Sequence, residues 1–250
     1  MHEIPVYSTD LTWIALRLEG LEETIIYHLI ERIQFCNNSA VYEAGKSGFE
    51  GEASRSLLDI RLMYHESMDA RFGRFEVPEE RPFNANLPHV MRKVNLPDYP
   101  IHLEDFDTVN LTNKIKQTYI AILPVICRSG DDGQYGSSVE HDVYTLQAIS
   151  RRIHYGALFV AESKYITDPG RFDVLIDSND TDKIMEALTR KEVEEKIIRR
   201  IREKVEIAQS KANRDIRILI DPETIVGFYR DTIIPLTKEG ELLYLLNRKR

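Results

Sequence analysis

The chain has 250 residues, 42% of them hydrophobic and 30% charged, a composition typical of a soluble globular protein. Its formal net charge of −8 argues against a nucleic-acid-binding surface, and no stretch approaches the roughly 18 apolar residues of a membrane span. Residues 1–5 lack the basic start and apolar run of a secretory signal, and Cys36 and Cys127 show no metal-ligand spacing. We therefore expect a cytoplasmic protein with reduced thiols that binds neither nucleic acid nor a membrane.

The first half of the chain predicts two helices joined by loops. Apolar residues at helical spacing follow Asp10, a good capping residue, and predict a helix that ends near Arg32. A polar, glycine-bearing loop is expected over 36–51, and a second helix over 53–72. Prolines then recur with little periodicity over 82–107, which predicts an extended connection across the surface.

Helices dominate the prediction for the second half as well. Glycines and aspartates favour turns, so residues 128–137 are predicted to form a loop. Residues 216–220 are the best candidate for a strand, but this run is short. Helices are predicted over 112–126, from 137 or 138 to about 165, and over 180–188, 191–210 and 222–247. The expected fold is therefore all-α: a multi-helix bundle that forms a single domain over 1–250.

Cations and apolar residues are interleaved between Ser150 and Lys164. Arg151, Arg152 and Lys164 share this helical stretch with isoleucine, phenylalanine and valine, so some of the charges should face a packed interior. An interior cation needs an anionic partner or an anionic ligand. The segment therefore predicts a pocket for an anionic small molecule.

Two pairs of polar residues add candidates for the same pocket. Glu194 lies four residues after Arg190, and Glu241 lies four after Thr237, so each pair shares one face of a helix. A solvated surface pair has the same spacing, so the spacing alone does not identify a site. The sequence contains no phosphate-binding loop, dinucleotide fingerprint or zinc motif, and we predict no metal and no cofactor.

Five segments, in order along nearly the whole chain, carry a more specific signal. They are residues 21–32, 73–79, 130–137, 150–164 and 235–246. Together they make the chain resemble the all-helical chorismate mutases of fungi and plants. The resemblance implies an isomerase that converts chorismate to prephenate for phenylalanine and tyrosine synthesis, by an intramolecular rearrangement that needs no cofactor. It also implies a homodimer with one pocket inside the bundle of each subunit.

The resemblance also implies roles for individual residues. Arg152 would hold a substrate carboxylate, Lys164 would donate to the ether oxygen, and Glu194 would bind the substrate hydroxyl. Thr237 would line the pocket, and Glu241 would face the ether oxygen as a protonated carboxyl group. Since burial should raise the pKa of Glu241, we expect activity to fall as the pH rises through that pKa.

The first helix departs from the family pattern. Ala15 stands where the resemblance implies an arginine that holds a second carboxylate. Arg17 and Lys238 are further candidates for substrate binding, although two residues turn a helix by about 200° and place Arg17 on the opposite face from Ala15. Arg190 could supply the missing cation, or it could be an ordinary exposed arginine.

The spacing between Arg152 and Lys164 also departs from the family pattern. Arg152 and Lys164 are 12 residues apart, one more than the resemblance implies. On a regular α-helix they would lie about 120° apart, whereas one residue fewer would leave about 20° between them. The extra residue therefore predicts a single-turn π-bulge near 155–159.

The resemblance further implies an effector site at a dimer interface. Gly136 and Ser137 would hold an amino-acid carboxylate at the start of a helix. Arg74 is retained from a basic pair whose other member is Gly73 here, and Asp221 occupies the position of a regulatory switch residue. Tryptophan and tyrosine are the implied effectors. The alternative function is a catalytically impaired relative that acts as an amino-acid-binding or partner-binding helical dimer.

Overall fold

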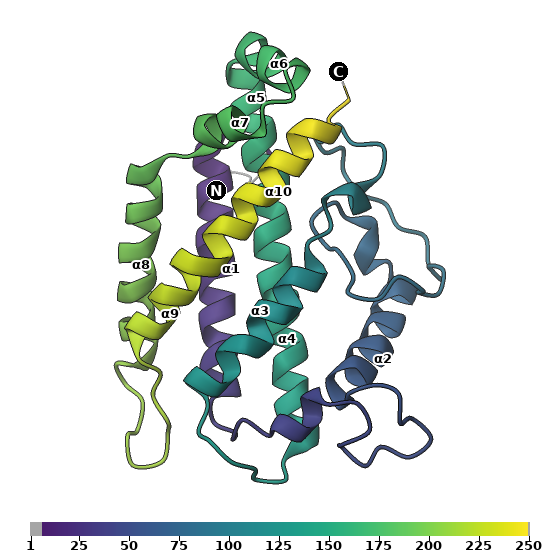
Figure 1. Ribbon diagram of the computed structural model, residues 1–250, viewed down its shortest axis with the longest axis vertical. Coiled ribbons are helices and arrows are strands. Elements are labelled where there is room, and N and C mark those ends of the chain that lie inside the picture. The colour runs from purple at the N-terminus through teal and green to yellow at the C-terminus, as the bar shows by residue number, and fades with distance from the viewer. Residues whose placement is uncertain (1–6, 250) are drawn as a thin grey trace.

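The computed structural model describes residues 7–249, and their regular elements are helices (Figure 1). The longer ones are α1 (Leu11–Arg32), α2 (Leu57–Phe72), α3 (Thr112–Ile126), α4 (Tyr135–Tyr155), α8 (Lys191–Gln209) and α10 (Ile234–Asn247). The shorter ones are η1 (Ser39–Tyr42), η2 (Arg74–Glu76), η3 (Phe106–Val109), α5 (Ala161–Thr167), α6 (Pro169–Asp177), α7 (Thr181–Leu188) and α9 (Pro222–Phe228). The prediction of an all-α fold is confirmed.

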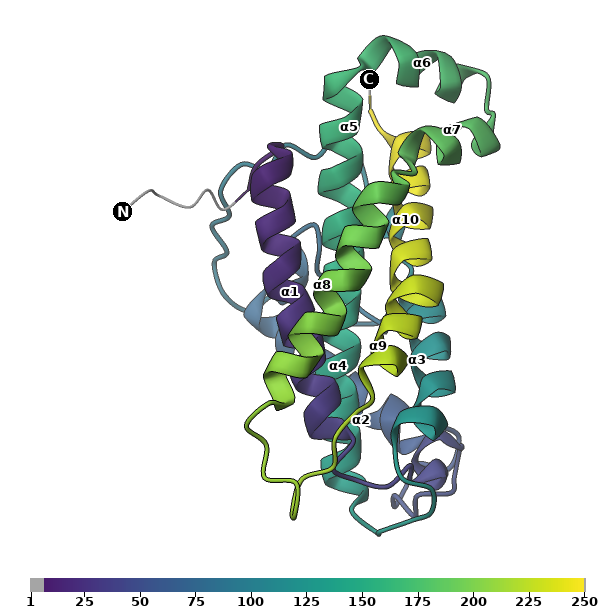
Figure 2. The same ribbon diagram turned by 90° about the vertical axis from the view of Figure 1, so that its left-hand side faces the viewer.

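The helices form an elongated bundle in which α1, α4, α8 and α10 run lengthwise (Figure 1). Helix α1 packs along α4, and α5 continues the line of α4 to the end of the molecule where α6 and α7 lie. Figure 2 shows α8 lying between α1 and α10 on one side of the bundle. Two apolar clusters fill the interior, one along the lower and middle part of α1, α3 and α4 and one around α5, α7 and α10.

Capping side chains decide where several helices begin. The Asp10 carboxylate accepts hydrogen bonds from the backbone N–H groups of Thr12 and Trp13, and α1 ends at Arg32 as predicted. Helix α2 begins at Leu57 instead of residue 53, because the hydroxyl of Ser56 is the group that accepts from its first turn.

Two further elements, α4 and α6, differ from the sequence prediction. Helix α4 begins at Tyr135, so the predicted loop over 128–137 is too long by three residues. The Asp132 carboxylate closes this loop early by accepting from the N–H groups of Cys36 and Gln134. Helix α6 was not predicted; Asp168 caps it, and a proline occupies its first position.

No strand occurs within residues 7–249, apart from one isolated bridge between Cys36 and Arg128, so the strand candidate at 216–220 is wrong. Side-chain amides take the place of a neighbouring strand. Gln34 pairs with both the N–H and the C=O of Ile218, and Gln209 does the same for Ile220. The backbone of this segment is therefore satisfied without a sheet.

Two π-helical turns interrupt the long helices. The first, η4 (Gly156–Val160), joins α4 to α5 and confirms the predicted π-bulge near 155–159. The second, η5 (Tyr229–Ile233), joins α9 to α10 and was not predicted. Pro235 follows it and has no N–H for the carbonyl of Asp231, so a regular ladder of α-helical hydrogen bonds cannot continue there.

The connection over 82–107 carries no regular element until η3 begins at Phe106. A buried carboxylate fixes its start: Glu66 accepts from the backbone N–H groups of Phe83 and Asn84 at 2.7 and 2.9 Å. Its later part lies against α10, where the Tyr244 hydroxyl accepts from the N–H of His102.

One buried polar cluster ties the lower end of the bundle together. Arg32 donates to Asp142 at 2.6 Å, and the hydroxyls of Tyr42 and Tyr119 donate to the same carboxylate at 2.7 Å. Arg32 and Asp142 are both fully buried, so each provides the opposite charge that the other needs, because burying an unpaired charge would be costly.

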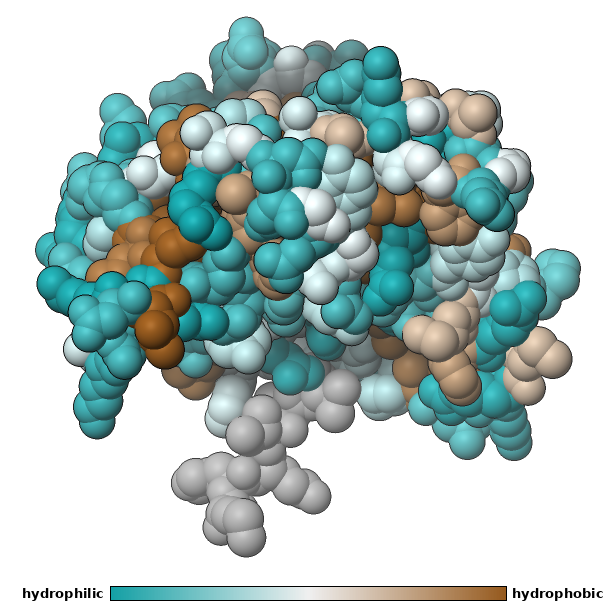
Figure 3. Space-filling view, turned by 90° about the horizontal axis from the view of Figure 1, so that it is seen from below, coloured by the Kyte–Doolittle hydropathy of each residue, from teal (hydrophilic) through white to brown (hydrophobic). Residues whose placement is uncertain are grey.

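Seen from below, the outer surface is largely hydrophilic, with apolar side chains gathered on the side where the lower end of α8 lies (Figure 3). Within residues 7–249, no helix combines the length and apolarity that crossing a bilayer requires.

Candidate functional site

A cavity of about 360 Å³ lies between α1, α4, α5, α8 and α10. Its apolar lining includes Leu11, Ile14, Ala15, Leu18, Val160, Leu188, Val193, Ile197 and Ile234. Its charged and polar lining comprises Glu22, Arg152, Lys164, Arg190, Glu194, Lys196, Arg200, Thr237, Lys238 and Glu241. The five residues that the sequence assigned to catalysis therefore all line one cavity.

Arg152 is held on two sides by the protein. Its Nη1 donates to the Thr237 hydroxyl at 2.8 Å, and that hydroxyl donates in turn to the carbonyl of Ile233. Its Nη2 lies 4.0 Å from Glu22 Oε1. The guanidinium is almost fully buried, and its Nε has no hydrogen-bond partner in the described structure. This leaves a fixed cation with an unused donor.

The π-helical turn η4 brings Lys164 to the same cavity as Arg152. A regular helix would rotate the two cations about 120° apart. Lys164 Nζ donates to Glu241 Oε2 at 2.6 Å and to the carbonyl of Leu188 at 2.7 Å. The lysine therefore links α5 to both α7 and α10.

Small residues allow α10 to approach the π-helical turn closely. A Cβ at Gly240 would lie 2.5 Å from the Cβ of Ala157, and one at Gly156 would lie 2.8 Å from Cγ2 of Thr237. Both distances are too short for carbon atoms in contact. The absence of side chains at Gly156 and Gly240 thus sets how near Thr237 and Glu241 come to the cations of α4 and α5.

Glu241 is a buried carboxyl group beside a cation. Burial raises the pKa of Glu241, and the opposing effect of Lys164 does not cancel that rise. The carboxyl group therefore keeps its proton to a higher pH than an exposed glutamate does. In its protonated form it can donate a hydrogen bond into the cavity.

The cations of the cavity near α8 are of two kinds, those with a carboxylate partner and those without one. Lys238 forms an ion pair with Glu194 at 3.0 Å, so both charges are partly neutralised. Arg190, the residue immediately before α8, lines the cavity and forms no ion pair within residues 7–249. Lys196 shares this lack of a carboxylate partner. Arg190 and Lys196 are therefore the cations left for an anionic ligand.

Glu22 is a part of the site that the sequence analysis did not assign. It is fully buried and accepts from Arg200 Nε and Nη2 at 2.9 and 2.7 Å, with Lys204 at 3.4 Å. It thereby joins α1 to α8 behind the cavity. Glu22 lies on the same buried face of α1 as Leu18 and Ile25, and a glutamate within that apolar stripe was the sequence signal that could have identified it.

Arg17 does not line this cavity, so its assignment to the same pocket is wrong. It lines a second cavity with Arg151, because it lies on the other side of α1 from Ala15. Ala15 itself lines the first cavity, as its place in the helix requires.

The candidate effector residues lie away from the cavity and from one another. Arg74 donates to Asp69, Glu80 and Gln147. Gly136 and Ser137 are in the first turn of α4, so they lie about 16 Å along that helix from the residue that Arg74 contacts. Asp221 caps α9 by accepting from the N–H of Glu223. Within one chain these residues do not form a single site.

No group of three or more metal-ligating side chains occurs in the part of the chain that the structure describes. The cavity is instead a mixture of permanent cations, hydrogen-bonding groups and carboxylates. Such a lining can bind and orient a small anion, and it can place a proton donor beside it.

No family model matches the chain. Individual relatives do. The chorismate mutase of Saccharomyces cerevisiae is 40% identical over 252 residues, which cover 98% of this chain and 97% of that protein. The structure of chorismate mutase from Candida albicans in complex with L-tryptophan is similar with a TM-score of 0.88 and 36% identity, covering 96% of this chain and 92% of the other. The structure of AtCM1 with phenylalanine bound in its allosteric site gives a TM-score of 0.83 and 35% identity, covering 95% and 96%.

Proposed function

The chain belongs to the family of eukaryotic chorismate mutases, and from that premise we propose that the cavity beside Arg152 and Lys164 is its active site. The chain is a chorismate mutase, an isomerase that converts chorismate to prephenate in the biosynthesis of aromatic amino acids. The observation that carries the assignment of the site is the meeting of Arg152, Lys164, Thr237 and Glu241 around one cavity.

Binding of the substrate is the first task of this site. Chorismate carries two carboxylates and must fold onto itself before it can rearrange. Arg152 holds one carboxylate through a guanidinium that Thr237 and Glu22 already orient. Arg190, which forms no ion pair within residues 7–249, holds the other carboxylate in place of the arginine that the family pattern has at position 15. Fixing both ends selects the compact conformer and lowers the entropic part of the barrier.

Stabilisation of the transition state is the second task. The ether bond breaks as a carbon–carbon bond forms, and the ether oxygen gains negative charge. Lys164 and protonated Glu241 donate to this oxygen, since their polar atoms lie 2.6 Å apart at one end of the cavity. Donors placed where charge develops act more strongly on the transition state than on the ground state.

The remaining polar residues orient the substrate. Glu194 accepts from the substrate hydroxyl, while Lys238 holds Glu194 in place by their ion pair. The buried position of Thr237 keeps Arg152 in one rotamer. No step of this mechanism requires a nucleophile from the protein.

Effector binding would need residues from two chains. In relatives, tryptophan, phenylalanine and tyrosine are bound, the last two in an allosteric site. We propose that tryptophan and tyrosine act on this chain through Arg74 of one subunit together with Gly136 and Ser137 of another, with Asp221 tuning the response. The separation of these residues within one chain supports a site shared between subunits.

A homodimer is proposed on the basis of α2. Tyr64, Met68 and Phe72 follow one another at intervals of four residues, and each is about half or more exposed. Three large apolar side chains on one face of a helix form an exposed stripe that a second copy would cover. Cys36 and Cys127 are free thiols, which fits the proposed cytoplasmic location.

Measurement of chorismate disappearance tests the proposed site. Removing a donor aimed at the developing charge should lower kcat by about 10²–10³-fold in Lys164→Ala. Lys183→Ala, on the exposed face of α7 where Lys183 pairs with Asp180, is the matched control and should keep full activity. Equal activity of folded Lys164→Ala and wild type would place catalysis elsewhere.

A second comparison tests the role of Arg190. Arg190→Gln should raise KM strongly, because one substrate carboxylate loses its cation. Arg199→Gln removes an exposed arginine from α8, the helix that follows Arg190, without touching the cavity, and it should leave KM unchanged. Loss of activity in both variants, or in neither, would contradict the role of Arg190. The alternative function, a catalytically impaired amino-acid-binding dimer, predicts no turnover in the wild type.

A further inference from the structure

The π-helical turn η4 leaves the orientation of α5 to side-chain contacts. In a regular α-helix each residue is bonded to the residue four earlier, but η4 interrupts this ladder between Arg152 and Lys164. One residue more or less turns everything that follows by about 100°. A shift of the π-helical turn past Lys164 would therefore turn the lysine away from the cavity. The contacts that hold α4 and α5 on either side of η4 prevent this shift.

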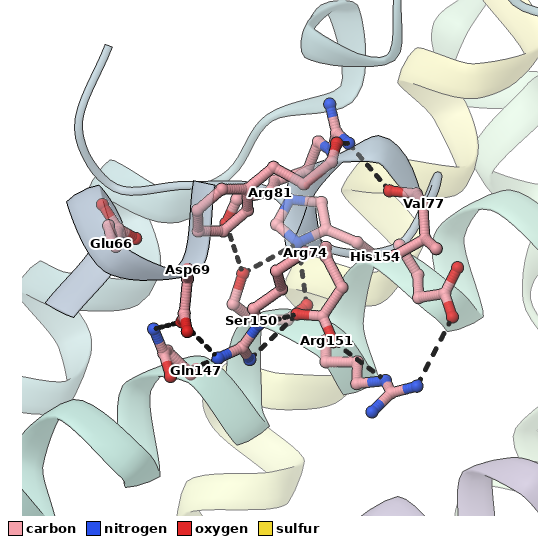
Figure 4. A network of polar contacts seen from close by, with 12 residues as sticks. Glu66, Asp69, Arg74, Val77, Arg81, Gln147, Ser150, Arg151 and His154 are labelled. Carbon is pink, nitrogen blue, oxygen red and sulfur yellow. Dashed lines mark hydrogen bonds and ion pairs between the residues drawn. The ribbon is translucent and has the colours of Figure 1, made fainter. Parts of the chain in front are cut away.

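On the α4 side, a buried histidine anchors the helix beside Ser150 (Figure 4). His154 is fully buried, and its Nδ1 lies 2.7 Å from the carbonyl oxygen of Ser150. Its Nε2 accepts from the backbone N–H of Leu111 at 3.0 Å, at the start of α3. Burial lowers the pKa of His154 to about 4, so the imidazole is neutral at pH 7 and can accept from that N–H. The last turn of α4 is thus fixed against α3 before η4 begins.

On the α5 side, the anchor is Glu162 with its partners Tyr244 and Arg248, three residues that we call the Glu162 cluster. Glu162 Oε2 accepts from the Tyr244 hydroxyl and from Arg248 Nε, each at 2.6 Å. Its Oε1 accepts from Arg248 Nη2 at 2.9 Å. The Glu162 side chain is only 1% exposed, and a bidentate arginine–carboxylate pair is a strong and directional contact. The cluster does not line the proposed active site, so the mechanism described above gives it no role.

Further contacts fix the arginine of this cluster. Arg248 directly follows the last residue of α10, and its guanidinium lies 3.7 Å from the centroid of the Tyr165 ring on α5. His102 Nε2 lies 3.6 Å from Glu162 Oε1, and the backbone N–H of Lys249 donates to the carbonyl of His102 at 2.8 Å. The end of α10 is therefore held against both α5 and the connection over 82–107.

Glu162 and Lys164 hold α5 from opposite sides. Two residues turn an α-helix by about 200°, so these two side chains leave α5 in nearly opposite directions. Lys164 reaches Glu241 on α10, and Glu162 reaches Tyr244, three residues later on the same helix. A rotation of α5 about its own axis that separated Lys164 from Glu241 would therefore also break the hydrogen bonds of Glu162.

We propose that the Glu162 cluster positions Lys164: it sets the rotation of α5 after the π-helical turn and thereby keeps the lysine against Glu241. Its three members are positioning residues, because they act on the reaction only through Lys164. This inference rests on the proposed function, in which Lys164 and Glu241 donate to the ether oxygen. The arginines that hold the substrate carboxylates lie outside α5, so the cluster affects the chemical step more than substrate binding.

Titration of Glu241 reports whether Lys164 stays in place. Burial raises the pKa of Glu241, whereas Lys164, Arg152 and Lys238 lower it, Lys164 most strongly. The other charged side chains of the cavity belong to α1, to α8 and to the residue before α8: Glu22, Glu194, Lys196, Arg200 and Arg190. A rotation of α5 would remove the strongest lowering effect and so raise the pKa of Glu241 further. An opposite charge at this distance changes a pKa by about 1–3 pH units.

Two readouts on the full-length protein test the proposal. The first is a carbon-13 NMR titration of protein labelled at the glutamate carboxyl carbon, with the Glu241 signal identified by its loss in Glu241→Gln. The second is chorismate kinetics at acid pH, where Glu241 is protonated in wild type and variants. In Arg248→Gln, we expect the Glu241 midpoint to rise by about one pH unit, kcat to fall by about tenfold or more, and KM to change less than about threefold. Arg248→Lys keeps the charge and should recover part of the loss.

Lys249→Gln is the matched control, since the Lys249 side chain adjoins Arg248 in sequence, is 58% exposed and pairs with Glu104. It should match the wild type in both readouts. Tyr244→Phe removes one hydroxyl from the cluster, and it should raise the Glu241 midpoint in the same direction if Arg248→Gln folds poorly.

An unchanged Glu241 midpoint in the folded cluster variants, or an equal shift in Lys249→Gln, would overturn the positioning role. The NMR titration needs no turnover, so it tests this role even if the proposed function fails. A wild type that leaves chorismate unchanged would refute the proposed function. An active wild type whose cluster variants behave like it would refute only the positioning role.

Discussion

At Gly240, a single added methyl group should push apart α10 and the π-helical turn η4, which both contribute to the proposed active site. Its added Cβ would lie 2.5 Å from the Cβ of Ala157 and 3.3 Å from Cδ1 of Leu111. Carbon atoms in contact prefer about 3.5–4.0 Å, so α10 would have to move by about 1 Å in Gly240→Ala. Thr237 lies one turn earlier on α10 and Glu241 is the next residue, so both would move with it.

Gly240→Ala is expected to lower both the stability and the catalytic rate. Overpacking a core by one methyl group costs about 1–3 kcal/mol of unfolding free energy. A displacement near 1 Å of groups that position a substrate costs about 10²-fold in rate, even when the mutated residue is not itself in contact with the substrate. We therefore expect Gly240→Ala to show a lower midpoint of urea denaturation and a large fall in kcat/KM for chorismate.

Gly227→Ala is the matched control. Gly227 lies in α9, in the same run of helices, and its added Cβ meets only Asp231 Oδ2 at 4.0 Å. Alanine favours the helix by about 1 kcal/mol over glycine, so this variant should be slightly more stable and fully active. The packing argument fails if Gly240→Ala keeps the stability and activity of the wild type, or if both variants lose activity equally.

Three further results are expected. Wild-type activity should fall, by up to about tenfold per pH unit, as the pH rises above the burial-raised pKa of Glu241. The activity of Glu241→Gln should be nearly independent of pH, because an amide donates at every pH. Paired pH–rate profiles test this expectation, and a flat wild-type profile would contradict it. Asp142→Ala leaves Arg32 buried without its counter-ion and should lose about 3–5 kcal/mol in urea denaturation; a loss below about 1 kcal/mol would show that the buried pair contributes little. Met68→Asp should shift the protein to a monomer in light scattering if the exposed stripe of α2 is the dimer interface, and an unchanged mass would place the interface elsewhere.

Local chemistry was sufficient to predict much of the fold. A capping aspartate and a regular apolar stripe defined α1 from Asp10 to Arg32, and both signals are contained within the helix itself. The π-helical turn η4 was predicted with the help of the family resemblance, because Arg152 and Lys164 are one residue further apart than the resemblance implies and two side chains that serve one cavity must share a face.

Tertiary contacts decided the features that sequence reasoning missed. Gln34 and Gln209 satisfy the backbone over 216–220, and neither partner can be identified from the local alternation that suggested a strand. Helix α4 begins early because Asp132 bonds across to Cys36, a contact between segments far apart in the chain.

The residues of the candidate site also divide into those that the sequence could identify and those that depend on tertiary contacts. Arg152 and Glu241 could be selected from the sequence because both belong to segments that resemble a family. Glu22 could not be assigned a role, although it lies in the buried stripe of α1, because its partners Arg200 and Lys204 are on a helix nearly 180 residues later. Arg17 was a candidate for substrate binding, although helix geometry already placed it on the face opposite Ala15, and it lines the second cavity with Arg151.

The charge balance of the cavity explains how the proposed active site can bind a dianion with alanine at position 15. Six cationic and three carboxylate side chains line it. Each carboxylate is already engaged: Glu22 by Arg200, and the other two by lysines at 3.0 and 2.6 Å. Arg190 and Lys196 have no such partner in the described chain, so the lining of the cavity carries a net positive charge. An arginine at position 15 would add one more positive charge to a site that already has an excess. In the proposed mechanism its absence changes the direction from which the second carboxylate is held, from α1 to the start of α8, and leaves unchanged the preference for a doubly negative ligand.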